Sequence, residues 1–182
     1  MTADRSDRSG AHTAGRSGPH TADRSGAHTA KSDSERALAL AYRYVNRRER
    51  TVAELRAHLA GRGVEPALAA QAIAELRGQG YVDDSRFARL FAADKRELEG
   101  WGGDRIARVL RERGLEQELI EAALDDASPA DELERALTLL RRRWPTPPGE
   151  SRERDRALAM LLRKGYDGEL AIEALDLHAR AA

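Results

Sequence analysis

The sequence contains no cysteine among its 182 residues. This absence excludes disulfide frameworks, cysteine-ligated zinc, iron–sulfur clusters and thiol nucleophiles. Aromatic residues make up only 4% of the chain, which disfavours a protein that binds single strands by stacking bases on several exposed rings. The formal net charge is zero, with 31 basic and 31 acidic residues. The chain therefore lacks the basic surplus that is common in proteins whose whole surface binds nucleic acid.

Long hydrophobic runs are also missing. No stretch of the sequence approaches the roughly 18 consecutive apolar residues needed to cross a bilayer. The N-terminus lacks the apolar core of a secretory signal. We therefore expect a soluble, cytoplasmic protein with no membrane association.

Residues 1–34 differ in composition from the rest of the chain, because they contain no Leu, Ile, Val or aromatic residue. Their eight-residue repeat is set by His12, His20 and His28. Such a segment cannot bury enough apolar surface to offset an ordering entropy of about 1–2 kcal/mol per residue, so we predict a disordered tail. The histidines are also consistent with a weak metal-binding tract, but their spacing defines no ligand geometry, and a duplicated low-complexity tail is the preferred interpretation.

Beyond residue 34 the chain is rich in Ala, Leu, Arg and Glu, which favour helices, and its apolar residues recur at helical spacing. Comparison of the sequence with itself shows that Gly63, Gly114 and Gly165 are spaced by 51 residues. Each follows a basic residue and precedes an apolar one. This pattern is typical of a helix C-terminus, where the base complements the helix dipole and glycine adopts the left-handed conformation.

A repeat of 51 residues is longer than the two-helix repeats of about 34–47 residues, whereas three helices of about 11–15 residues fit it well. We therefore predict an all-α protein of three tandem three-helix repeats at residues 35–82, 83–127 and 128–182, which form an elongated, curved array through shared apolar surface. Several helix starts are also predicted, by Thr51 and Glu54 as a capping box, Asp83 or Asp84, Ser128 before Pro129, and Asp167.

Catalytic and metal-binding patterns are scarce. Outside the tail only His58 and His178 occur, each alone in a predicted helix, where a surface or core position is more common than catalysis. The Asp83-Asp84 pair supplies too few oxygen ligands for a divalent metal. No phosphate-binding loop is present, and the glycines at 100–103 lack the strand and helix of a dinucleotide site. We expect neither catalytic activity, nor a metal, nor a cofactor.

Charge is distributed unevenly over the repeats. Residues 36–82 carry eight Arg and four Glu, residues 83–127 carry eight basic and twelve acidic residues, and the third repeat is balanced. A surface that faces phosphates or acids is one interpretation, and a solvated face with favourable charges at helix ends is equally consistent with the pattern. The candidate partner-binding residues are Arg43, Arg47, Arg48, Arg50, Arg56 and Arg62, followed by Arg141, Arg142 and Arg143.

The segment from Gly80 to Ala88 reads Gly-Tyr-Val-Asp-Asp-Ser-Arg-Phe-Ala. It resembles the Gly-Tyr-Leu-Asp-Asp-x-Arg-Phe-Ala hallmark of the RecX family, regulators of the bacterial RecA recombinase. The stretch from Arg47 to Leu59 is similar to the family's Arg-x-x-Ser/Thr-x-x-Glu-Leu segment. Residues 100–114 resemble its Gly-x-Gly-x-x-Arg-Ile stretch, and residues 164–166 stand where the family has Arg-Gly-Phe. The resemblance covers residues 36–182 and leaves the tail out.

The resemblance implies a non-enzymatic regulator that binds the RecA filament on single-stranded DNA. Members of this family damp strand exchange, ATP hydrolysis and cleavage of the SOS repressor, without a cofactor. We expect a monomer with at most weak direct DNA binding. We interpret the hallmark residues as structural: Asp83 and Asp84 cap a helix, Phe87 packs in the core, and Arg86 pairs with an acid of its own repeat. The alternatives are a stand-alone DNA-binding protein of helix-turn-helix type and a generic helical adaptor.

Overall fold

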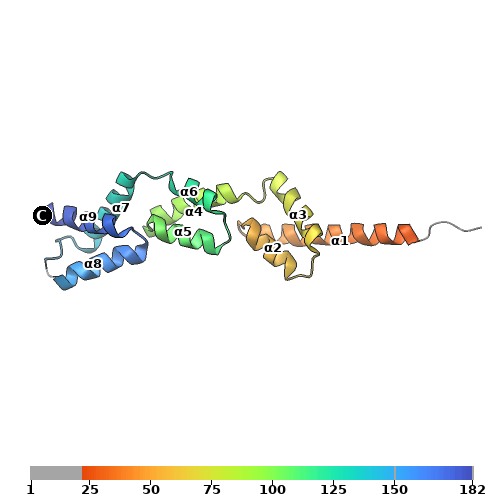
Figure 1. Cartoon of the computed structure of the whole chain (residues 1–182), viewed down its shortest axis with the longest axis horizontal. Helices are drawn as coiled ribbons and strands as arrows, with labels where there is room; N and C mark the ends of the chain where they lie inside the picture. The colour runs from red at the N-terminus through yellow and green to blue at the C-terminus, as the bar shows by residue number, and fades with distance from the viewer. Residues whose placement is uncertain (1–21, 150, 182) are drawn as a thin grey trace, which may run out of the picture.

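The computed structural model describes residues 22–149 and 151–181, with side chains from residue 31 onward. The described residues form nine α-helices and no strand. These helices make three units of three helices each, which follow one another in an elongated row (Figure 1). The predicted all-α architecture of tandem three-helix repeats is confirmed. Within the described part of the chain, no helix is both long and apolar enough to span a membrane.

The first unit packs α1 (Ala22–Val45), α2 (Val52–Ala60) and α3 (Pro66–Gly78) around an apolar core. Buried residues recur along α1 at every fourth position, which places them on one face of the helix. Thr51 and Glu54 form the predicted capping box at the start of α2. The buried core residues of this unit are Ala37, Ala41, Val45, Leu55, Leu59, Ala69, Ala72, Ile73, Leu76 and Val82.

Helix α1 begins at Ala22, inside the segment predicted to be a disordered tail. Residues 1–21 of that segment lie outside the described residues. Among the described side chains of α1, the first buried one is Ala37, so residues 31–36 continue the helix without a buried side chain. Once packing has nucleated a helix, each further residue adds one backbone hydrogen bond without any apolar burial. The predicted tail therefore overlaps the first part of α1, which reaches back to Ala22.

The second and third units repeat the arrangement of the first. Helices α4 (Asp84–Glu99), α5 (Gly103–Glu112) and α6 (Gln117–Leu124) surround a core that includes Phe87 and Trp101. Ser128 and Asp131 form a capping box before α7 (Pro129–Arg143), which is followed by α8 (Ser151–Lys164) and α9 (Gly168–Arg180). Asp167 caps α9, as predicted. His178 is buried, and its Nε2 lies 2.8 Å from the carbonyl oxygen of Trp144, which ties the proline-rich segment to α9.

The repeated glycines occupy identical turns at the ends of α2, α5 and α8. Gly63, Gly114 and Gly165 have φ of 72°, 78° and 89°. In each turn the residue after the glycine donates its N–H to the carbonyl of the leucine five residues earlier, at 3.1–3.2 Å. The glycine itself donates to the carbonyl three residues back. These bonds define a Schellman motif, so the pattern found in the sequence corresponds to one recurring helix end.

The turn after α5 forms the joint between the first and second units. The Oγ1 hydroxyl of Thr51, at the start of α2, donates to the carbonyl of Arg113 at 2.9 Å. The N–H of Val52 donates to Oδ1 of Asp84 from α4, also at 2.9 Å. A Cβ built on Gly114 would lie 2.4 Å from Cβ of Ala53. The C-terminus of α5 therefore sits directly against the N-terminus of α2.

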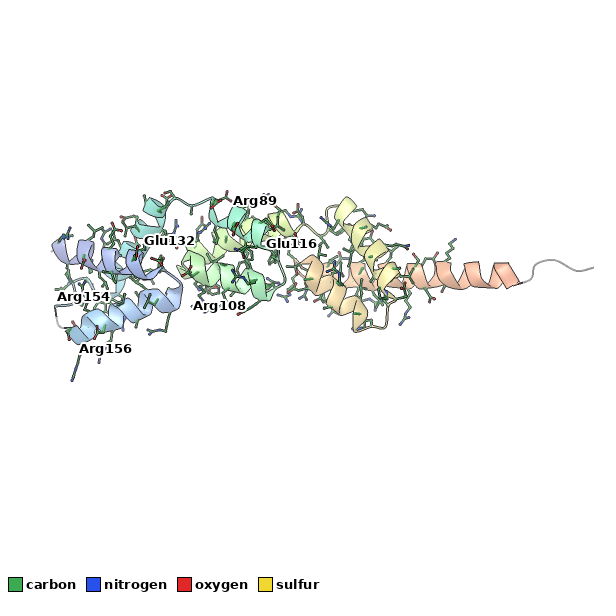
Figure 2. All side chains as sticks on the ribbon, viewed as in Figure 1. Arg89, Arg108, Glu116, Glu132, Arg154 and Arg156 are labelled. Carbon is green, nitrogen blue, oxygen red and sulfur yellow. The ribbon has the colours of Figure 1, made fainter. Side chains whose placement is uncertain are left out.

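The joint between the second and third units follows the same plan one repeat later. The N–H of Gly102 donates to the carbonyl of Lys164 at 2.9 Å, and that of Asp104 donates to the carbonyl of Gly165 at 3.1 Å. The N–H of Gly103 donates to Oε1 of Glu132 at 2.7 Å, and Glu132 lies where these two units meet (Figure 2). Helices α2, α5 and α8 thus follow one another head to tail along the row (Figure 1).

Candidate interaction surface

Three of the predicted arginines line one cavity on the first unit. Arg43 lies in the last turn of α1, Arg47 lies in the turn that follows α1, and Arg62 lies in the turn after α2. Together with Leu40, Tyr44 and His58 they surround a cavity of about 120 Å³. All three arginine side chains are exposed. The cavity therefore presents three guanidinium groups to solvent within a small concave area.

An aromatic stack forms the base of this arginine cavity. The rings of Tyr44 and His58 lie parallel, with centroids 4.0 Å apart and an interplanar angle of 6°. The Arg50 guanidinium lies 4.2 Å from the Tyr44 ring centroid. Burial lowers the pKa of His58, and the neighbouring Arg62, Arg50 and Arg47 lower this pKa further. The imidazole is therefore neutral at pH 7, and the arginines alone supply the positive charge of the cavity.

The other predicted arginines of the first unit point elsewhere. Arg48 lies 3.9 Å from Oε1 of Glu54, and Arg50 is held over the Tyr44 ring. Arg56 lines a different cavity of about 170 Å³ at the first joint, which it shares with Asp84 and Glu116. The sequence grouped six arginines, and the structure brings three of them to one cavity.

The run Arg141–Arg143 at the end of α7 is divided among three environments. Arg141 Nη1 lies 2.7 Å from Oε1 of Glu134, while the Arg143 guanidinium lies 5.8 Å from the Trp144 ring centroid. Arg142 lines a groove against the end of α4. Successive residues of a helix point in directions about 100° apart, so a run of three cannot form one face.

The family hallmark contributes mainly to the first joint. Asp83 caps α4 by accepting the N–H of Arg86 at 2.9 Å, whereas Asp84 accepts the Val52 N–H of the preceding unit. Arg86 Nε lies 3.6 Å from Oε1 of Glu49. The expected partner of Arg86 within its own unit was therefore wrong, because Glu49 belongs to the first unit.

Arg113 is a joint residue that the sequence analysis did not single out. Its guanidinium donates to Oε1 of Glu54 through Nε at 3.1 Å and Nη2 at 2.8 Å, and lies 4.4 Å from the Phe87 ring centroid. The ion pair between Arg113 and Glu54 is stronger than an exposed one, because the guanidinium makes two hydrogen bonds to the carboxylate and packs against an aromatic ring. The sequence does give one indication of its importance, because the residue before the repeated glycine is basic in all three repeats.

The arginine cavity suits the binding of an anionic group. Among the side chains from residue 31 onward, no group of three His, Asp or Glu residues is placed to hold a metal ion. A concave cluster of guanidinium groups can pair with phosphate or carboxylate oxygens. The fold and this surface define a helical-repeat protein with a basic face on its first unit.

Comparison with known proteins assigns this helical-repeat protein to a family. The first, second and third three-helix domains of RecX match residues 37–76, 83–124 and 130–175. The chain belongs to the RecX family of regulatory proteins.

Two relatives illustrate the similarity. The regulatory protein RecX of Deinococcus radiodurans is 36% identical over 141 residues, which are 78% of this chain and 67% of that protein. The regulatory protein RecX of Mycolicibacterium smegmatis is 31% identical over 153 residues, and 81% of each chain is covered. The crystal structure of RecX from Lactobacillus salivarius shares the fold, with a TM-score of 0.74 and 17% identity over 84% of this chain and 99% of that one.

Proposed function

We propose that this protein binds the filament that the RecA recombinase forms on single-stranded DNA and inhibits its activities, acting in the cytoplasm as a non-enzymatic regulator. Membership of the RecX family of regulatory proteins carries this proposal. The basic face of the first unit and the elongated row support it, because both suit docking along another macromolecule. Recombination, the ATPase and the coprotease activity of the filament are the processes affected.

The first unit makes the main electrostatic contact in this proposal. The cavity formed by Arg43, Arg47 and Arg62 concentrates positive charge on a unit with a surplus of basic residues. Acidic side chains of the recombinase, or exposed phosphates of its DNA, are the groups that would pair with it. Arg142 is a second contact, in a groove between the second and third units. Exposed charges at the edge of an interface, such as these arginines, affect the association rate and its salt dependence more than the final affinity.

The length of the row determines how the units cooperate. Each unit reaches a different part of a filament, so a weak contact by one unit raises the effective concentration of the next. Hydrogen bonds between neighbouring units fix the joints. The three units therefore keep constant positions relative to one another. Several weak contacts then give firm binding without any single deep site.

The proposal is tested by titrating the protein into DNA-dependent ATP hydrolysis by the cognate recombinase. We expect the wild-type protein to inhibit hydrolysis, and the variant R43E/R47E/R62E to require at least about tenfold more protein for the same inhibition, because it reverses the charge of the whole cavity. Inhibition should also weaken as salt is raised.

The matched control is R152E/R156E/R163E, which changes the net charge equally at three exposed positions of α8. This variant should inhibit like the wild type. Equal loss in both variants would mean that net charge, not the cavity, matters. No inhibition by the wild type would contradict the proposed function. Tight binding to duplex DNA without recombinase, with a steep salt dependence, would favour the stand-alone DNA-binding alternative.

A further inference from the structure

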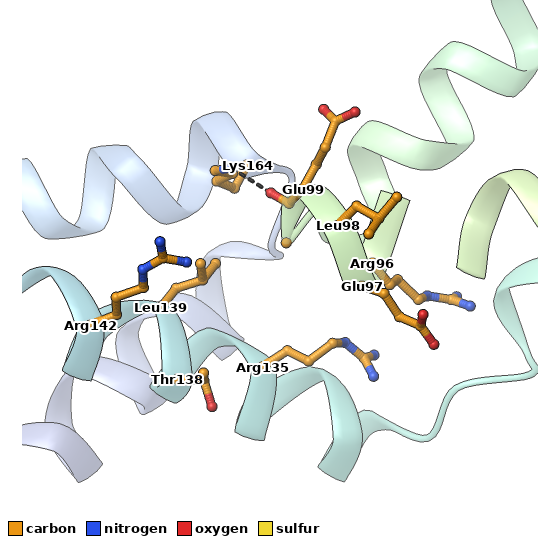
Figure 3. Close-up of a pocket in the computed structure, with 10 residues that line it drawn as sticks. Arg96, Glu97, Leu98, Glu99, Arg135, Thr138, Leu139, Arg142 and Lys164 are labelled. Atoms are coloured by element: carbon orange, nitrogen blue, oxygen red, sulfur yellow. Dashed lines mark hydrogen bonds between the residues drawn. The ribbon is translucent and has the colours of Figure 1, made fainter. Parts of the chain in front are cut away.

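A second concave surface lies between the second and third units, away from the arginine cavity. Its volume is about 630 Å³, and it is lined by the last turn of α4, the outer face of α7 and the end of α8. Figure 3 shows the side chains of Arg135 and Arg142 extending from α7 into the space that faces α4 and α8. We refer to this surface as the α4–α7 groove.

Positive charge dominates the α4–α7 groove. Four cationic side chains line it, against two carboxylates from α4: Arg96, Arg135, Arg142 and Lys164 against Glu97 and Glu99. Two of the four cations already have partners in the fold. The Arg96 guanidinium donates to the carbonyl of Leu124 at 3.0 Å, and Lys164 Nζ donates to the carbonyl of Glu99 at 2.5 Å.

The remaining cations of the groove are available to a partner. No carboxylate of the described side chains lies within 4.0 Å of Arg135 or Arg142. The Nε of Arg135 is buried and has no hydrogen-bond acceptor among the described residues. Burial lowers the pKa of Arg96, and the positive charge of Arg135 lowers this pKa further, whereas the carboxylates of Glu132 and Asp126 raise it. The like charges of Arg96 and Arg135 therefore repel each other, and Glu132 and Asp126 offset part of this repulsion.

Apolar surface lies beside these charges. Leu98 is 81% exposed, the largest exposed fraction among the large apolar side chains described. Leu139, on the facing helix α7, also lines the groove and is only partly buried. A single exposed leucine is ordinary on a protein surface, but two leucines that line one concave basic site can receive an apolar side chain.

We propose that the α4–α7 groove binds an acidic protein segment that carries one large apolar side chain. Its carboxylates pair with Arg135 and Arg142, and its apolar side chain covers Leu98 and Leu139. A nucleic-acid strand complements the groove less well, because its phosphates would leave Leu98 and Leu139 exposed to water. The inference adds a ligand class to the contact that the proposed function gives Arg142, and peptide binding itself does not require that the recombinase is the partner.

Fluorescence anisotropy of the full-length protein tests the inference. The probe is a short fluorescein-labelled peptide of Asp and Glu residues with one central Leu, and a second peptide replaces that Leu with Ser. We expect the Leu peptide to bind and the Ser peptide to bind about tenfold more weakly, since burial of a leucine contributes at least that factor. L98S should weaken the Leu peptide about tenfold and leave the Ser peptide unchanged, which couples the two leucines in a double-mutant cycle.

Matched variants separate the groove from the rest of the surface. R142E should weaken both peptides about tenfold, whereas R152E, an exposed charge reversal on α8, should not. L90S removes a 50% exposed leucine from the same helix, outside the groove, and should leave binding unchanged. Circular dichroism checks that each variant folds.

Several outcomes would overturn the inference. These are no binding of the Leu peptide at low salt, equal binding of the two peptides, or equal weakening by R142E and R152E. Displacement of the peptide by oligo-dT, with oligo-dT binding unaffected by L98S, would assign the groove to nucleic acid. Sedimentation that rises with protein concentration and is abolished by R142E would assign it to a second copy of the chain. If only the ATPase test above fails, the groove proposal stands.

Discussion

The two adjacent aspartates of the hallmark, Asp83 and Asp84, have different roles although they are neighbours in the chain. Asp83 accepts a hydrogen bond within its own helix, whereas Asp84 accepts the Val52 N–H of the neighbouring unit. Burial raises the pKa of Asp84, although its bond to Val52 acts in the opposite direction. A carboxyl group whose pKa is higher in the folded protein stabilises the fold as pH falls, and this contribution is lost as pH rises through the folded pKa.

The raised pKa of Asp84 leads to a prediction about its substitution. D84A should lower the free energy of unfolding at pH 7 by about 1–3 kcal/mol, because it leaves the Val52 N–H without an acceptor. D84N keeps an acceptor and carries no charge to desolvate, so it should be at least as stable as the wild type at pH 7. Urea unfolding at pH 7 and pH 5 measures both effects, and D84N should flatten the pH dependence. A D84N protein as unstable as D84A would show that the negative charge itself is needed.

At this scale the sequence predicted capping by the aspartate pair but not the bond across the joint. Capping depends on neighbours along the chain, which a sequence displays directly. The partner of Asp84 lies 32 residues away, and the partner of Arg113 lies 59 residues away. Such pairs depend on how the units dock, which local patterns do not encode.

At the scale of helices and turns, the three Schellman motifs have the same backbone but different surroundings. A Cβ on Gly63 would meet nothing within 4 Å, whereas one on Gly114 would meet Ala53 at 2.4 Å. The spacing of the glycines predicted the turns correctly. It did not distinguish the open turn of the first unit from the two turns that serve as joints, because the three share the same local pattern.

The contrast between these glycines gives a matched prediction. G63A should lower the free energy of unfolding by about 1–2 kcal/mol, since alanine resists the left-handed conformation. G114A should lose this amount and about 1–3 kcal/mol more, because its Cβ overpacks the joint against Ala53. Denaturant unfolding of both variants measures the difference. Equal losses would mean that the joint at Gly114 tolerates an added methyl group without strain.

At the scale of the whole molecule, the chain is a row of three small cores connected by backbone contacts. Helical periodicity and the repeat predicted this architecture, because each unit encodes its own amphipathic helices. The basic first unit was also visible in the sequence as a charge surplus. The α4–α7 groove was not predicted, because it depends on how α7 lies against the second unit. The separation of Arg141, Arg142 and Arg143 follows from helix geometry alone, which the prediction did not apply to this run.

The rigidity of the row is open to direct measurement. Gly102 has an ordinary φ of −82°, but a Cβ there would lie 2.3 Å from the carbonyl oxygen of Gly165. G102A should therefore leave helix content unchanged and loosen only the second joint. Spin labels on A60C and L162C, in a chain that has no other cysteine, should give a narrow distance distribution that G102A broadens.

The control for this measurement is G168A, because Gly168 has nothing within 4 Å of a built Cβ and no left-handed φ. It should leave the label distances unchanged. A broad distribution in the wild-type background would show that the units move independently and would contradict a fixed joint.

The head-to-tail order of α2, α5 and α8 has a further consequence. These three helices all run, from N-terminus to C-terminus, from the third unit toward the first. The positive ends of their dipoles therefore all face the third unit, and the two tips of the molecule differ. One tip displays the uncovered Gly63 turn beside guanidinium groups, and the other displays the start of α8. On any polymer whose subunits all face one way, a molecule of this kind can align in a single sense, with its arginine tip always leading toward the same end.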